Sequence, residues 1–424
     1  MKAPIYQTIA QRIRQRIASG HYTPGTRIPS IRQLAGEFGC NKLTAHRAYE
    51  TLRKEGLIEN RVGSGSYVRF PEKINPPGGT LDFRTDYLDE SLFPFQQVQE
   101  IFNDLFTREK AYALAPTPTE GDAGLLEVLG QYYHVPVDRM VVISGAQQGL
   151  DLVAKVFAAK ISETTLFEDP TYPGALSLFK ARHFVPLGDD GPDLERLASK
   201  LKQTSIRLFY TMPTVHNPTG SAYSLDKKQA VAGLAERHDF YIVEDDFLSE
   251  FRSRIGQRFV DICPRQTIYI KSLSQTTVPG IRLGFMVVPE NLYAKFLYAK
   301  FSSDIASFGL MQRCMYEFFK KGLYQRHLRN VEAKIAYRRE KLLAQIESHR
   351  QLSASRHQAG YSLWVRSHQP ITMPQVPWSR GEEFSFSREA RFQFRLSFMH
   401  MDDTAFEEGA AYLERIWHML TRSA

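Results

Sequence analysis

The sequence has few cysteines and no long apolar run. Its 424 residues include three cysteines, Cys40, Cys263 and Cys314, whose wide spacing predicts neither a disulfide framework nor a cysteine-based zinc site. No apolar run approaches the ~18 residues of a membrane-spanning helix. The N-terminus also becomes charged too soon for a signal peptide. The twelve histidines show no metal-ligand spacing. We therefore expect a cytoplasmic protein without a metal site or a membrane partner.

Positive charge is concentrated at the N-terminal end of the chain. The first 70 residues contain twelve Lys or Arg and four Glu, and their net charge of +8 equals that of the whole chain. Residues 71–424 are therefore neutral overall. A basic module joined to a neutral body predicts that a polyanion binds to the module.

Three helices and a hairpin are predicted in residues 1–70. Isoleucines at every fourth position from Ile5 to Ile17 indicate one amphipathic helix. Ser30 and Asn41 are suitable N-caps for a second helix and for a third, from Lys42 to Glu55. Two short strands then flank a tip at residues 61–65. This order predicts a winged helix-turn-helix, whose third helix places its early residues in the major groove of DNA.

The same segment resembles the DNA-binding domain of GntR-type bacterial repressors over nearly its whole length. The resemblance and the position in the third helix assign DNA contacts to six residues: Arg32, Lys42, Thr44, His46, Arg47 and Gly65. Lys42 and His46 stand where relatives often have arginine, and lysine cannot make the forked contact that arginine makes with guanine. The operator sequence is therefore not transferable from relatives. The alternative for these charges is a merely solvated helix face.

A linker at residues 71–81, rich in proline and glycine, leads to a body at residues 82–424. Short apolar runs there alternate with amphipathic stretches such as Gln147–Ala158 and Leu225–His238, the pattern of a parallel sheet with crossover helices. A long helix is expected near Lys320–Glu347. We expect a large subdomain at about 135–310, and a small one made of 82–134 and 311–424.

Polar clusters follow five of the predicted strands, where ligand sites of α/β sheets lie. Together they resemble fold-type I pyridoxal-phosphate enzymes, which have the aspartate aminotransferase fold. With the module in front, the chain resembles a MocR-type regulator over about residues 1–400. The resemblance implies cofactor contacts at Gly145, Ala146, Tyr172, Asn217, Asp245, Ser272 and Arg282, and a clamp for a ligand carboxylate at Arg395. The alternative for Arg395 is an exposed strand residue.

The pattern is broken at the residue that should form the Schiff base. Gln275 stands seven residues before Arg282, in the place of that lysine, and an amide nitrogen is not a usable nucleophile. Phe247 stands where a tyrosine normally supports the phenolic oxygen. Two changes favour natural loss of catalysis over an engineered lysine replacement. Lys271, four residues before Gln275, is interpreted as a strand-end surface charge rather than a substitute.

Three functions are compatible with these residues. The favoured one is a DNA-binding transcriptional regulator, catalytically inactive, whose body dimerises head to tail and senses a small effector. Pyridoxal phosphate or a related pyridoxine phosphate would then bind non-covalently at most. The second is a pyridoxal-phosphate-dependent aminotransferase with an appended DNA-binding domain. The third is a regulator with a ligand-free, structural body that has lost the cofactor.

Overall fold

The chain consists of two compact units, Met1–Thr80 and Leu81–Ala424. The computed structural model describes residues 4–18, 22, 26–55, 57–61, 65–68, 81–157, 164–179, 182–252, 256–355, 359–370 and 376–422. The predicted linker lies outside these residues, apart from Leu81, as do residues 62–64 of the predicted wing tip.

The first unit has three helices and one antiparallel hairpin among its described residues. Their bounds are α1 Ile5–Ala18, α2 Ile31–Glu37, α3 Lys42–Lys54, β1 Ile58–Arg61 and β2 Gly65–Val68. Both predicted caps are present: Ser30 and Gln33 form a capping box, and Asn41 Oδ1 accepts the Thr44 N–H at 2.7 Å. The apolar stripe of α1 differs from the expectation at its start, because Ile5 is exposed while Ile9 and Ile13 enter the core.

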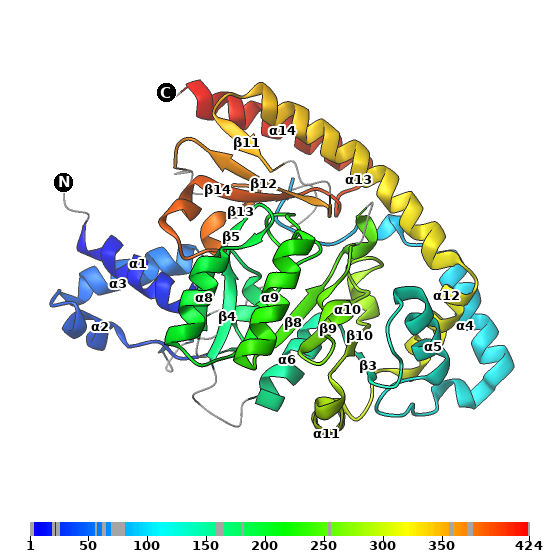
Figure 1. The fold of residues 1–424 in the computed structure, drawn as a ribbon. Coiled ribbons are helices and arrows are strands. Elements are labelled where there is room, and N and C mark those ends of the chain that lie inside the picture. The colour runs from blue at the N-terminus through cyan, green and yellow to red at the C-terminus, as the bar shows by residue number, and fades with distance from the viewer. Residues whose placement is uncertain are drawn as a thin grey trace. The chain divides into compact units, whose positions relative to one another are not determined.

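The second unit contains a mixed eight-stranded sheet, with strand order β3-β10-β9-β8-β7-β4-β5-β6 (Figure 1). The strands are β3 Met140–Ile143, β4 Thr164–Asp169, β5 Arg182–Gly188, β6 Gly191–Pro192, β7 Ile206–Thr211, β8 Tyr241–Asp246, β9 Thr267–Ser272 and β10 Gly284–Val287. The expectation of an all-parallel sheet is wrong at β10, which is antiparallel to both β3 and β9, and at β6, which is antiparallel to β5.

Five of these strands nevertheless end at one edge of the sheet. Strands β4, β7, β8 and β9 pair in parallel, and β3 has the same direction as β9 because each is antiparallel to the β10 between them. The five polar clusters of the sequence follow these five strands. Their side chains are therefore gathered at the carboxyl edge.

Helices cover both faces of this sheet. Side chains alternate along each strand, so that in β4 Leu166 enters one core and Phe167 the other. The first core is closed by α8, α9 and α10, and the second by α6, α7 and α11. Their bounds are α6 Ala146–Phe157, α7 Pro173–Leu176, α8 Leu194–Gln203, α9 Leu225–His238, α10 Phe259–Ile262 and α11 Glu290–Asp304.

The remaining elements build a four-stranded antiparallel sheet and helices around it. The sheet has the order β11-β12-β14-β13, and α13 and α14 lie side by side over it (Figure 1). The long helix predicted near Lys320–Glu347 is α13, which begins three residues later than predicted because Gly322, at φ +67°, separates it from α12. The bounds are α4 Phe95–Glu109, α5 Ala123–Tyr133, α12 Gly309–Lys320, α13 Leu323–Ser348, α14 Asp403–Arg422, β11 Leu352–Ala354, β12 Ser362–Ser367, β13 Ser379–Arg380 and β14 Gln393–Ser397.

Candidate functional site

Asp245, near the end of β8, has a carboxylate oxygen without a partner. Its Oδ2 accepts the Tyr210 hydroxyl at 2.7 Å, whereas its buried Oδ1 has no hydrogen-bond partner among the described residues. Burial raises the pKa of Asp245 to about 6. A buried acceptor without a donor is costly, and the ring N–H of a protonated pyridine would satisfy it.

Tyr172, which follows β4, lies among the charged groups of the predicted site. The pKa of Tyr172 is raised to about 12, chiefly by burial and also by the charges of Asp245 and Asp86, while Arg395 and Arg282 act in the opposite direction. Its ring packs on Gly174, where an added Cβ would lie 2.4 Å from the Tyr172 Cζ atom. The aromatic ring is thus packed against the backbone of Gly174.

The candidate anion cradle lies at the N-terminus of α6, where Arg282 packs against Ser144 and Gly145. Arg282 donates from Nη2 to the Ser144 carbonyl at 2.8 Å, and a Cβ added to Gly145, at φ +87°, would come within 3.0 Å of the same nitrogen. Ala146 is the first residue of α6, whose free N–H groups attract anions. Ser272 is the last residue of β9 and is buried. A guanidinium, helix amides and a hydroxyl suit a phosphate.

Arg395 is buried in β14, so the reading of an exposed strand arginine is wrong. Its Nη1 donates to Asp86 Oδ2 at 2.7 Å and to Asn217 Oδ1 at 2.8 Å. The Asn217 amide in turn donates to the same Asp86 oxygen at 3.1 Å. Sequence reasoning missed Asp86, because no motif marks it and its partner is 309 residues away.

Gln275 is held by a side chain from the smaller sheet. The hydroxyl of Tyr361, a fully buried residue just before β12, donates to Gln275 Oε1 at 2.6 Å. Phe247 packs against two apolar cores: the one closed by α6, α7 and α11, and the one that contains Tyr361. At these two positions the structure therefore has an engaged amide and a phenyl ring.

Lys271 is not the surface charge that the sequence suggested. It is fully buried and contacts Asp246 at 3.3 Å and Glu250 at 2.6 Å. Although burial lowers the pKa of Lys271, these two carboxylates raise it above its ordinary value. Alternation along β9 directs Lys271 away from the face that Ser272 occupies.

The predicted DNA contacts lie on the surface of the first unit. Arg32, Lys42, His46, Arg47 and Gly65 are exposed and Thr44 is half-buried. The Arg47 guanidinium lies 4.4 Å from the centre of the Tyr6 ring. Sequence reasoning missed Arg27. A Cβ added to Gly65 would lie 2.9 Å from the Arg27 Nε, so the Arg27 side chain lies against the hairpin.

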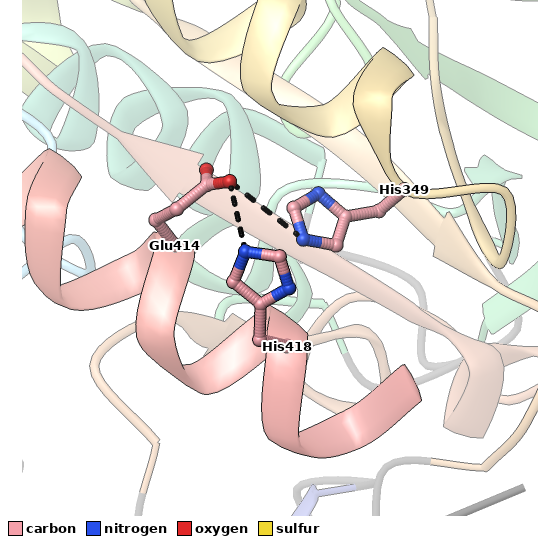
Figure 2. Close-up of side chains that lie close together, drawn as sticks. All are labelled: His349, Glu414 and His418. Atoms are coloured by element: carbon pink, nitrogen blue, oxygen red, sulfur yellow. Dashed lines mark ion pairs between the residues drawn. The ribbon is translucent and has the colours of Figure 1, made fainter. Parts of the chain in front are cut away.

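One histidine cluster lies apart from these residues. Glu414 and His418, on α14, meet His349, which caps α13 (Figure 2). The carboxylate lies 3.8 Å from His349 Nε2 and 3.5 Å from His418 Nε2. The donor atoms spread over 4.8 Å, whereas tetrahedral zinc would bring them to about 3.4 Å of one another. The arrangement as it stands is that of ion pairs.

The fold and this site define an aminotransferase-like body behind a DNA-binding module. Residues 86–411 match the model for aminotransferase class I and II, and residues 5–68 match that for bacterial regulatory proteins of the gntR family. The chain belongs to the aminotransferase class I and II family, with a gntR-type domain fused in front. No helix in the described part of the chain is long and apolar enough to cross a membrane.

Several relatives share both parts of the chain. YcxD of Bacillus subtilis, described as an HTH-type transcriptional regulator, is 29% identical over 88% of each chain. The probable rhizopine catabolism regulatory protein MocR of Rhizobium meliloti is 25% identical over 92% of this chain and 87% of its own. The solved structure of LysN, an aminoadipate aminotransferase of Thermus thermophilus, has the same fold, with a TM-score of 0.74 at 24% identity, over 82% of this chain and 94% of its own.

Two adjacent aspartates should respond oppositely to neutralisation. The folded-state pKa of Asp245, about 6, lies above its ordinary value of 3.8. The free energy of unfolding therefore decreases as the pH rises between these two values, because the folded protein must then hold a buried ionised carboxylate. Asp245→Asn should therefore raise the thermal midpoint at pH 8, by the equivalent of about 2–3 kcal/mol, and change it little at pH 4.

Asp246→Asn is the matched control. Burial raises the pKa of Asp246, but Lys271 and the Tyr269 hydroxyl lower it below its ordinary value. Removing this charge leaves Lys271 with Glu250 as its one carboxylate partner among the described residues and should destabilise the protein at pH 8 by about 3–5 kcal/mol. A lower midpoint for Asp245→Asn at pH 8 would contradict the assignment of an unpartnered carboxylate.

Proposed function

We propose that the chain is a DNA-binding transcriptional regulator whose aminotransferase-like body binds a phosphorylated pyridine reversibly and does not transaminate. The observation that carries this proposal is the unpartnered buried oxygen of Asp245. It is combined with Gln275, an amide at the position where the resemblance implies the Schiff-base lysine. Acting on chromosomal DNA, the regulator would work in the cytoplasm.

The residues of the site fit pyridoxal phosphate or a close relative. Asp245 would accept the ring N–H, Tyr172 would stack on the ring, and the amide of Asn217 would contact the phenolic oxygen. The phosphate would be held by Arg282, Ser272 and the backbone of Gly145 and Ala146. In enzymes this cofactor supplies an electron sink for carbanion chemistry.

The chain's own residues argue against the same chemistry here. Transamination needs an amine that holds the cofactor and moves a proton between carbons. Gln275 offers an amide, whose oxygen is engaged by Tyr361. Lys271, the nearest lysine in sequence, is bound by Asp246 and Glu250 and is held protonated, so it is a poor nucleophile.

Titration with pyridoxal phosphate tests this proposal on the full-length protein. We expect saturable binding by calorimetry, fully removed by dialysis, because Gln275 offers no amine and Lys271 is bound by two carboxylates. Gln275→Lys should instead retain the cofactor after borohydride reduction, as a mass increase on Lys at that position. Covalent labelling of the unaltered protein at one lysine would support the enzyme alternative. No binding to either protein would support the ligand-free scaffold.

DNA binding is assigned to the exposed face formed by α2, the start of α3 and the hairpin. Arg32→Ala should weaken binding to an operator fragment, selected from random DNA with the full-length protein, by about tenfold. The slope of log affinity against log salt concentration should also become shallower by about one, because one phosphate contact is lost. Arg53→Ala is the control, because Arg53 lies in the last turn of α3, paired with Glu50 at 2.7 Å. Equal affinities of the two variants would overturn the assignment of Arg32.

We also propose a head-to-tail homodimer of the second unit. Its described surface exposes large apolar side chains around the end of α11 and before α5: Tyr112 (68%), Leu114 (63%), Ile305 (64%) and Phe308 (64%). Ser307, between the last two, lies 3.3 Å from Ser144 beside the anion cradle. An exposed apolar patch of this kind is typical of an interface, here one that borders the ligand site.

Phe308→Asp tests the dimer without removing a structural group. Phe308 is the N-cap of α12, a position that favours aspartate, so the fold should persist while the interface gains a charge. Sedimentation velocity should show a dimer for the unaltered protein and a monomer for this variant. Leu225→Asp, at an exposed position that begins α9, should remain dimeric. An unaltered protein that sediments as a monomer would refute the proposal.

A further inference from the structure

Asp86 and Arg395 form a largely buried ion pair within the candidate ligand site. The side chains are 18% and 7% exposed, and Asp86 Oδ2 lies 2.7 Å from Arg395 Nη1. The second guanidinium nitrogen donates to the Arg84 carbonyl at 3.0 Å, and Nη1 also reaches Asn217. Three of the guanidinium's donor interactions are thus made inside the chain.

The segment that carries Asp86 is firmly attached to the smaller sheet. The Phe83 carbonyl accepts the Ser397 N–H at 2.8 Å, and the Asp89 N–H donates to the Met399 carbonyl at 2.7 Å. Asp86 therefore reaches Arg395 from backbone that is hydrogen-bonded beside β14 on both sides of it. The pair is part of the packed structure rather than a contact between surface side chains.

Other cations near Asp86 are already engaged. Arg84 donates to Asp82 at 2.8 Å, and the same Asp82 accepts the Thr85 hydroxyl at 2.7 Å. Arg282, another cation of the candidate site, donates to the Ser144 carbonyl. Asp86 and Arg395 are therefore each other's ion-pair partners among the described residues.

We propose that Asp86 is a built-in carboxylate for Arg395, so that the site admits phosphorylated pyridines but rejects their adducts with α-amino acids. This inference rests on the proposed function. A ligand carboxylate at Arg395 would have to displace Asp86, leaving its charge buried and unpaired, or lie beside it as a like charge. A free aldehyde or amine carries no such group and leaves the ion pair intact.

Two reduced adducts that differ by one carboxylate test the inference. N-(5′-phosphopyridoxyl)-L-alanine carries the α-carboxylate, and N-(5′-phosphopyridoxyl)ethylamine lacks it. Calorimetry with the full-length protein should show at least tenfold weaker binding of the alanine adduct. Asp86→Asn removes the competing charge while keeping an oxygen for Arg395, and it should reverse the preference, because a charge-assisted hydrogen bond to the ligand becomes available.

The control and the outcomes separate this inference from the function on which it rests. Asp82→Asn, which neutralises a carboxylate paired with Arg84, should keep the preference of the unaltered protein. An unaltered protein that favours the alanine adduct, or an unchanged preference in Asp86→Asn, would overturn the role of Asp86 while leaving ligand binding in place. Failure of both adducts and of pyridoxal phosphate to bind any variant would overturn the proposed function, and this inference with it.

Discussion

The candidate site depends on the cross-strand ion pair between β8 and β9. Asp246 and Lys271 are partners in the parallel register of these strands, and both are fully buried. Breaking such a pair leaves a buried charge uncompensated, so a shift of one residue between the strands would be heavily penalised. Because neighbouring side chains point to opposite faces, the same register directs Asp245 and Ser272 to the ligand side.

The two adjacent carboxylates, Asp245 and Asp246, therefore lie in different environments. Asp246 meets Lys271 and the Tyr269 hydroxyl at 2.6 Å, and is kept ionised. Asp245 accepts one hydroxyl, and its second oxygen is buried without a hydrogen-bond donor among the described residues. Burial raises its pKa, and a further donor would stabilise the ionised form. The difference comes from which face each residue occupies rather than from the residue type. An ionised, satisfied group stabilises the sheet, and an unsatisfied one is suited to a cationic ligand.

Local signals in the sequence were sufficient for much of this architecture. The caps Ser30 and Asn41 and the bounds of α9 follow from near-neighbour chemistry, and the structure has them as predicted. The clusters at strand ends were likewise placed at one edge. The antiparallel direction of β10 and the burial of Lys271 were not predictable, since each depends on contacts between elements. Asp86 was missed for the same reason, because the residues around it in sequence do not indicate a partner on β14.

Both positions that would serve a transamination are occupied by the chain itself. Gln275, where the resemblance implies an amine, is bound by Tyr361, and Arg395, where it implies a substrate carboxylate, is bound by Asp86. Tyr361 and Arg395 belong to the smaller sheet region, while Gln275 and Asn217 follow strands of the larger sheet. These hydrogen bonds therefore join the two sheets across the ligand site. A ligand that replaced any of them would change how the two sheets are held together, which is the coupling that the proposed sensor would need.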